Sequence, residues 1–254
     1  MELTPLQWGL GAGAAFLIGF SKTAVPGLGI MTVPLLAAAF GGRTSVGVML
    51  PMLVFADLFA AGWYRRHARW DELRRISPGV VLGLGLGAAA LWAFGAMPGE
   101  VDIMAKAIGW LALLMVAAHL VRSRISPGQL SKLSVAILGA TAGFATTVAN
   151  AAGPVMTIYL TAQRLPKEQF MGTHAWYFLI FNLVKLPIYG AITLLTPNQP
   201  LFSSFSILFN LYMAPVIVVG ALLGRQLFPR IPKKMFENLA LGFAAIASVY
   251  LIAK

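Results

Sequence analysis

Long runs of apolar residues, separated by short polar stretches, cover almost the whole chain of 254 residues. A helix of about 20 apolar residues, rising about 1.5 Å per residue, crosses the roughly 30 Å hydrocarbon core of a membrane. The runs lack the alternation of apolar and polar positions that a membrane β-barrel needs. We therefore predict an all-α polytopic membrane protein. Its apolar segments are residues 5–20 with 28–40, 46–63, 78–96, 103–121, 133–149 with 152–162, 170–195, 205–224 and 235–252.

Two of these segments are interrupted at corresponding places. The first interruption reads GFSKTAVPGLG at residues 19–29, and the second reads GFATTVANAAG at residues 143–153. Proline removes a backbone donor and glycine permits unusual backbone conformations. The sequence of residues 19–29 is therefore unsuited to an unbroken membrane helix. Freed backbone at membrane depth is tolerated only inside protein or beside a cavity. Paired interruptions in two halves indicate the binding site of a transporter.

Charge sets the expected orientation. Lysine and arginine number 19 against 8 acidic residues, and hydrophobic residues make up 59% of the chain. The basic residues gather in the loops 64–76, 122–132 and 164–167, whereas the loop 97–102 carries only acids. This is the positive-inside pattern of a membrane protein, so the net charge of +11 predicts no nucleic-acid partner.

The same loops predict two re-entrant hairpins. Residues 133–163 begin and end at basic, cytoplasmic loops and are too short to cross the membrane twice. They fit a hairpin of two half-helices, and residues 5–42 fit a second hairpin that enters from the outer side. The alternative is eight simple spans with a parallel repeat.

Further matches between the halves predict an inverted repeat in one integrated transmembrane domain, with four segments each in residues 1–125 and 126–254. The matched positions are Gly47 with Gly172, Asp57 with Asn182, Pro78 with Pro215, Gly83 with Gly220, and Gly87 with Gly224. Of these, Gly83 and Gly87 in one helix and Gly220 and Gly224 in the matching helix indicate close packing between membrane helices.

Lys22 is the leading candidate for chemistry. It lies at the first break between two hydroxyl side chains, and a half-helix starting near Gly27 would aim free N–H groups and a positive dipole end at the same place. Such a combination binds anions. The alternative is a lysine that extends to the membrane surface. We expect one wall of the site from Ser21, Lys22, Thr23, Gly27 and Gly29, and an uncharged second wall from Thr147, Asn150 and Gly153.

Asp57 lies within a predicted membrane span, where an unpaired carboxylate is costly. Asn182, its repeat mate, and Lys185 lie at a similar depth. One interpretation pairs Asp57 with Lys22 or Lys185 as a structural ion pair, and the other makes it a proton carrier. His174 and His119 are expected to be packed or interfacial rather than proton relays.

Several classes of function are excluded by missing residues. The chain has no cysteine, and its three histidines lack metal-ligand spacing, so we predict no metal and no cofactor. Residues 83–87 read GLGLG without the strand of a dinucleotide fold, and residues 19–23 lack the spacing of a P-loop. No nucleophile and base accompany either break, so we predict that the protein is not an enzyme.

The interrupted motif resembles the first signature of the TauE/SafE family of sulfite and sulfonate exporters, also called TSUP. The resemblance covers essentially the whole chain and includes residues 19–29, 33–36, 50–51, 56–57, 64–67 and Trp70. Many members carry a run of glycines at the positions of residues 22–26. Lys22 therefore adds a fixed charge to the site of this chain. The resemblance implies export of sulfite, sulfoacetate or related anions across the plasma (inner) membrane, driven by an ion gradient. A proton is the candidate coupling ion, with Asp57 as its candidate carrier.

We therefore expect a multi-pass secondary transporter of small sulfur oxyanions that works by alternating access. An anion channel or a permease for another small anion on the same scaffold is the alternative. A membrane-embedded enzyme and a scaffold protein are the remaining rivals, and short loops disfavour the latter. The oligomeric state stays open.

Overall fold

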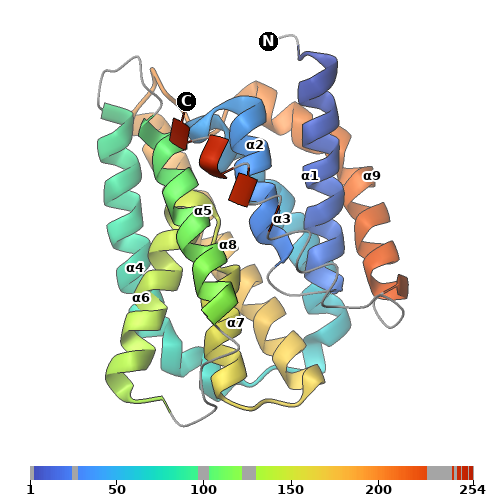
Figure 1. The fold of residues 1–254 in the computed structure, drawn as a ribbon, viewed down its shortest axis with the longest axis vertical. Coiled ribbons are helices and arrows are strands. Elements are labelled where there is room, and N and C mark those ends of the chain that lie inside the picture. Colours follow the sequence, from blue (N-terminus) through green and yellow to red (C-terminus); the bar gives the residue numbers. More distant parts are fainter. Residues whose placement is uncertain are drawn as a thin grey trace.

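The computed structural model describes residues 3–24, 28–96, 103–121 and 130–227, with 242, 245, 246, 248–250, 252 and 253 (Figure 1). Most residues in these ranges are helical, and none of them is in a strand. Within these ranges, five helices are long and apolar enough to cross a membrane: Gly42–His67, Trp70–Ala96, Lys132–Ala149, Lys167–Leu195 and Ser204–Leu227. The predicted all-α polytopic class is confirmed. The helices are α1 (Pro5–Thr23), α2 (Thr32–Phe40), α3 (Gly42–Tyr64), α4 (Trp70–Ala96), α5 (Ile103–Val121), α6 (Lys132–Ala149), α7 (Gly153–Ala162), α8 (Lys167–Leu195) and α9 (Ser204–Leu227), with short 3₁₀ turns η1 (Leu28–Met31) and η2 (Arg65–His67).

Helices α1 and α2 form the first hairpin. Thr4 caps α1 in a reciprocal capping box with Gln7, and Pro5 occupies the first turn, where its missing N–H costs nothing. The Gln7 Nε2 donates to the carbonyl of Ala39 near the end of α2, at 2.8 Å. This bond joins the outer ends of the two helices, so the break after Thr23 forms the tip of the hairpin.

Helices α6 and α7 form the second hairpin. Asn150 ends α6 in the left-handed conformation (φ 54°), which asparagine adopts more readily than most residues with a side chain. Gly153 and Pro154 then start α7, where proline suits the first turn. Arg75 donates to the Leu130 carbonyl at 2.6 Å and to Gln163 Oε1 at 3.4 Å. Both outer ends of this hairpin therefore lie together.

The two hairpins enter from opposite ends of the molecule (Figure 1). Helix α3 runs between these ends, because its 23 residues span about 34 Å. At its start, Arg43 donates to the Gln199 and Leu91 carbonyls and to Thr196 Oγ1, at 2.5, 2.6 and 2.8 Å. Past its end, the Arg69 N–H donates to Thr173 Oγ1 near the start of α8. This arrangement supports the inverted repeat, which stays a prediction.

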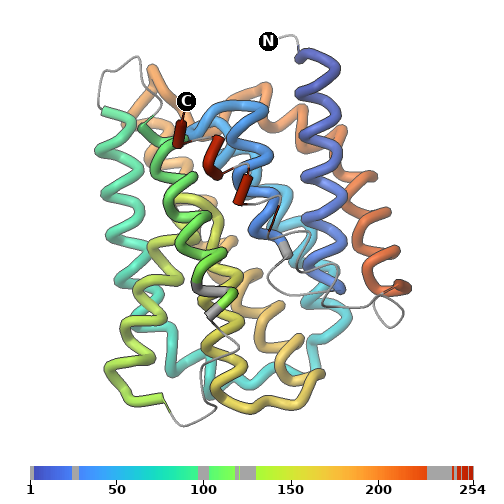
Figure 2. Tube along the Cα trace, viewed as in Figure 1, coloured from blue at the N-terminus to red at the C-terminus, as the bar shows by residue number. Residues whose placement is uncertain are grey.

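Each hairpin packs along a long helix from the other half of the chain, α1 along α9 and α6 along α4 (Figure 2). Gly19 contacts the backbone of α9 so closely that an added Cβ would collide with the Ile217 carbonyl. Gly143 stands against the Val80 carbonyl of α4 in the same way. In turn, Gly83 of α4 lies equally close to the backbone of α6, and Gly220 of α9 lies equally close to the backbone of α1. The predicted close glycine packing between membrane helices is confirmed.

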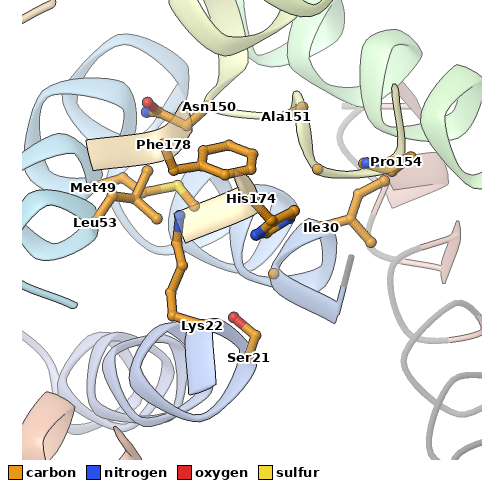
Figure 3. Close-up of a pocket in the computed structure, with 12 residues that line it drawn as sticks. Ser21, Lys22, Ile30, Met49, Leu53, Asn150, Ala151, Pro154, His174 and Phe178 are labelled. Carbon is orange, nitrogen blue, oxygen red and sulfur yellow. The ribbon is translucent and has the colours of Figure 1, made fainter. Parts of the chain in front are cut away.

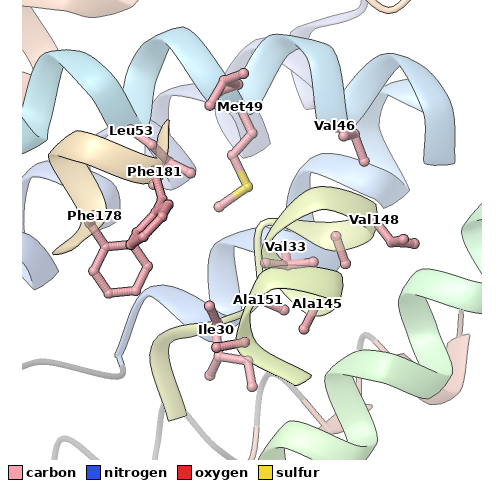
Figure 4. Close-up of a cluster of buried hydrophobic side chains, with 14 of the residues drawn as sticks. Ile30, Val33, Val46, Met49, Leu53, Ala145, Val148, Ala151, Phe178 and Phe181 are labelled. Atoms are coloured by element: carbon pink, nitrogen blue, oxygen red, sulfur yellow. The ribbon is translucent and has the colours of Figure 1, made fainter. Parts of the chain in front are cut away.

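Buried apolar side chains fill the space where the hairpin tips meet α3 and α8 (Figure 4). Ile30 comes from the first hairpin, Ala151 from the second, Met49 from α3 and Phe181 from α8. Large side chains such as Leu86, Trp110 and Leu194 are instead exposed on the outer faces of their helices. An apolar outer surface around a packed interior is typical of helices surrounded by lipid, and it places the hairpin tips deep inside the protein.

Candidate functional site

The first hairpin tip carries a buried ion pair. Lys22 lies in the last turn of α1, and its Nζ is 2.7 Å from Oδ1 of Asp57 in α3. The two side chains are 8% and 0% exposed. The same ammonium lies 3.8 Å from the centre of the Phe178 ring, which adds a cation–π contact. Of the interpretations of Asp57, the ion pair with Lys22 is present, and the proton-carrier role stays a prediction.

Asp57 also joins α3 to α8. The Asn182 Nδ2 donates to the second carboxylate oxygen of Asp57 at 2.6 Å, and both side chains are fully buried. The two residues that the sequence alignment of the halves matched therefore contact each other directly. A buried carboxylate needs several partners. The hydrogen bond from the Asn182 side-chain amide and the ion pair with Lys22 together account for the position of Asp57 inside the protein.

Lys185 brings a second charge to the other hairpin tip. Its Nζ donates to the Thr146 carbonyl at 2.9 Å, to Thr146 Oγ1 at 2.9 Å and to Asn150 Oδ1 at 2.7 Å. A cation at the C-terminus of α6 interacts favourably with the last carbonyls of the helix. The expectation of an uncharged second tip is wrong, because α8 supplies a lysine that the sequence of the tip does not contain.

A cavity of about 40 Å³ lies between the two tips (Figure 3). A single water needs roughly 10–15 Å³ measured in this way, so the cavity has room for a compact ion or a few waters. Helices α3 and α8 complete its walls. Its lining residues are Ser21, Lys22, Gly29, Ile30, Met49, Leu53, Asn150, Ala151, Gly153, Pro154, His174 and Phe178.

The structure brings five of the predicted wall residues to this cavity: Ser21, Lys22, Gly29, Asn150 and Gly153. Asp57, Asn182 and Lys185 lie behind the lining and bond to it or to each other. Gly27 lies outside the described residues.

Thr23 and Thr147 are placed elsewhere. The Thr23 hydroxyl donates to the Ala221 carbonyl of α9 at 2.8 Å and stands against Gly224. The Thr147 hydroxyl donates to the Gly143 carbonyl at 2.8 Å, and its side chain stands against Gly87 of α4. Both threonines are fully buried between helices rather than in the cavity lining. Their matched positions hold the two hairpins to their partner helices.

The wall that α8 contributes to the cavity was not among the predicted walls of the site. His174 and Phe178 line the cavity, and the His174 ring packs against Phe170 and Phe178, with centroids 6.1 and 4.7 Å away. The signal was present, because residues four apart share one helix face. Phe170, His174 and Phe178 form such a stripe, which Asn182 continues. Among the residues that the structure describes, no group of three histidine or acidic side chains lies close enough to hold a metal.

The model of the sulfite exporter TauE/SafE family matches residues 11–251. The chain belongs to this family. The match covers most of the first hairpin, the whole second hairpin and every residue that lines the cavity, and the resemblance drawn from the interrupted motif is thereby confirmed. Searches among curated proteins and among solved structures found no match.

TauE/SafE proteins are membrane transporters of the sulfite-exporter type rather than enzymes. The five long apolar helices agree with a multi-pass membrane protein. The family does not assign the roles of individual side chains, so the substrate-binding residues stay a prediction that the cavity geometry supports.

Proposed function

We propose that this TauE/SafE protein is a secondary transporter that exports small sulfur-containing oxyanions, such as sulfite or sulfonates including sulfoacetate, across the inner membrane. The observation that carries the proposal is the cavity between two hairpin tips that enter from opposite ends of the molecule. Interrupted helices of this kind hold the substrate in many secondary transporters.

The chemistry of the cavity favours an anion. The Lys22 ammonium is part of the lining, and the Ser21 hydroxyl and the Asn150 amide are further polar groups there. An oxyanion that enters offers Lys22 an alternative partner to Asp57, and a charge-assisted hydrogen bond of this kind is among the strong ones. A cationic solute would instead meet an unfavourable charge. The small volume favours an ion with few heavy atoms.

The packing of the hairpins supports alternating access. The first hairpin and α9 form one unit, and the second hairpin and α4 form another. The cavity lies between these units, beside α3 and α8. A movement of one unit relative to the other opens the cavity to one side, and the opposite movement opens it to the other side. In this account residues 1–125 and 126–254 are two inverted repeats, and each repeat contributes the hairpin of one unit and the long partner helix of the other.

Efflux from proteoliposomes loaded with sulfite tests the proposal. We expect efflux that saturates with sulfite concentration, responds to an imposed proton gradient and is strongly reduced by Lys22→Ala. Lys106→Ala, in α5 and outside the cavity lining, is the matched control and should retain the flux. Flux that neither saturates nor couples to a gradient would favour an anion channel. Efflux equal to that of protein-free vesicles would refute anion transport.

A further inference from the structure

His174 has an unused polar atom at the cavity. Its side chain is only 5% exposed, and its Nε2 is buried without a hydrogen-bond partner among the described residues. Buried polar atoms are almost always hydrogen-bonded, so an exception calls for an explanation. In Figure 3 the His174 ring and the Lys22 ammonium extend from opposite walls into the same space. The packing role expected from sequence accounts for the faces of the ring but not for this nitrogen.

The buried charges around the cavity do not cancel. Lys22 and Asp57 neutralise each other across 2.7 Å. Lys185 donates to three oxygen acceptors, which matches the three N–H groups of a charged ammonium. No carboxylate pairs with Lys185 among the described residues. The site therefore holds one uncompensated positive charge when His174 is neutral.

We infer that the cavity accepts one net negative charge, and that a divalent oxyanion binds there together with one proton held by His174. This inference rests on the proposed function and specifies the ionic form of its substrate. A monovalent sulfonate cancels the charge of Lys185 by itself. A divalent anion leaves a net negative charge in a site of low polarity, which is costly. One proton from solvent converts the imidazole to imidazolium, whose Nε2–H then donates to an oxygen of the anion.

Other groups around His174 are already committed. Lys22 from α1 faces the imidazole across the cavity and is paired with Asp57 of α3. Lys185 lies further along α8 and is fixed by the second hairpin tip. Arg69, whose backbone contacts the neighbouring Thr173, directs its guanidinium to Asp71 at 2.9 Å. Among the described charged side chains near the cavity, His174 is thus the group whose titration changes the charge without breaking an existing bond.

Calorimetric titration of the purified full-length protein tests this inference. Methanesulfonate is the monovalent probe and sulfate the divalent one, and each is titrated in buffers with different ionisation heats to count protons. We expect methanesulfonate to bind without proton uptake. Sulfate should bind with uptake of one proton, so its affinity should fall about tenfold for each pH unit of increase where His174 is neutral. His174→Gln should abolish the uptake and flatten this pH dependence. His67→Gln, at an exposed turn, should retain both.

The outcomes separate the inference from the proposed function. If neither probe binds, anion binding itself is refuted. If both probes bind to the wild-type protein without proton uptake, this measurement alone overturns the inference, and the proposed function still stands. Uptake that persists in His174→Gln but disappears in Asp57→Asn would identify Asp57 as the proton carrier and overturn the role of His174.

Discussion

The two hairpin tips face one cavity but acquire their positive charges in different ways. The first tip contains its own lysine, Lys22, which is paired with the carboxylate of Asp57. The second tip receives Lys185 from α8, and three neutral oxygens hold that ammonium. The lysine at the first tip has a competing carboxylate within reach, whereas no carboxylate of the described residues forms an ion pair with the lysine at the second tip. We infer that the first lysine exchanges partners during transport and the second fixes the shape and charge of the site.

The comparison depends on the hairpins lying on opposite sides, and labelling of introduced cysteines checks this with an all-or-none result. The natural chain contains no cysteine, so each introduced thiol is unique. Asn198, next to the Gln199 that Arg43 contacts, marks the end from which the first hairpin enters. Glu168 lies in the first turn of α8, at the end from which the second hairpin enters.

We expect an impermeant reagent to label Asn198→Cys in intact cells and Glu168→Cys only after permeabilisation. The positive-inside rule places the basic loops in the cytoplasm, which fixes this polarity. Labelling of both positions from the same side would contradict the opposed hairpins and with them the inverted repeat.

The next largest effect is expected when Lys22 at the first tip loses its carboxylate partner. Asp57→Ala leaves the ammonium of Lys22 buried without its partner, and breaking such a pair typically costs about 3–5 kcal/mol of folding stability. Lys22→Ala combined with Asp57→Ala should recover part of this loss, because no lone charge remains. Thermal unfolding in detergent measures both variants.

Two further variants sharpen this result. Lys185→Met strands no carboxylate, so it should lower the melting temperature less than Asp57→Ala does. Asp71→Ala removes an exposed partner of Arg69 and should leave the melting temperature essentially unchanged. If the double variant were no more stable than Asp57→Ala, the ion pair would not explain the burial of Lys22.

A smaller effect is expected at the glycine contacts that hold the hairpins to their partner helices. An added Cβ at Gly83 of α4 would collide with the Ala140 carbonyl of α6, whereas Gly85 has open space around it. Gly83→Ala should therefore destabilise the protein by about 1–3 kcal/mol, in the range of overpacked cores. Gly85→Ala, two residues along the same helix, should be neutral or stabilising by up to about 1 kcal/mol, because alanine is the better helix former. Equal melting temperatures for the two variants would contradict a close contact between α4 and α6 at Gly83.

Sequence reasoning located most of the architecture because membrane spans and helix breaks leave local signatures. The apolar runs predicted the long helices, and the matched glycines predicted where helix backbones approach closely. The same reasoning placed Thr23 and Thr147 in the site, because hydroxyls beside a break look alike whether they line a cavity or join two helices. The charge at the second tip was missed, since Lys185 is more than 30 residues from the tip and reaches it only through tertiary packing. His174 was expected to be packed or interfacial, and its place in the cavity wall was not predicted for a related reason. The stripe on α8 shows which residues share a face but not what that face meets.

The central claim is that a substrate anion takes its charge contact from Lys22. The most direct measurement compares methanesulfonate binding to Asp57→Asn with binding to Asp57→Asn combined with Lys22→Ala, so that neither protein retains a competing carboxylate at this position. A charge-assisted hydrogen bond contributes about 1.5–3 kcal/mol. At about 1.4 kcal/mol per decade, we predict that Lys22→Ala weakens binding by roughly ten- to a hundredfold in this background. Lys106→Ala in the same background should bind as the parent does. If Lys22→Ala changes the affinity by less than about twofold in a folded protein, Lys22 does not bind the anion and the account of the site is wrong.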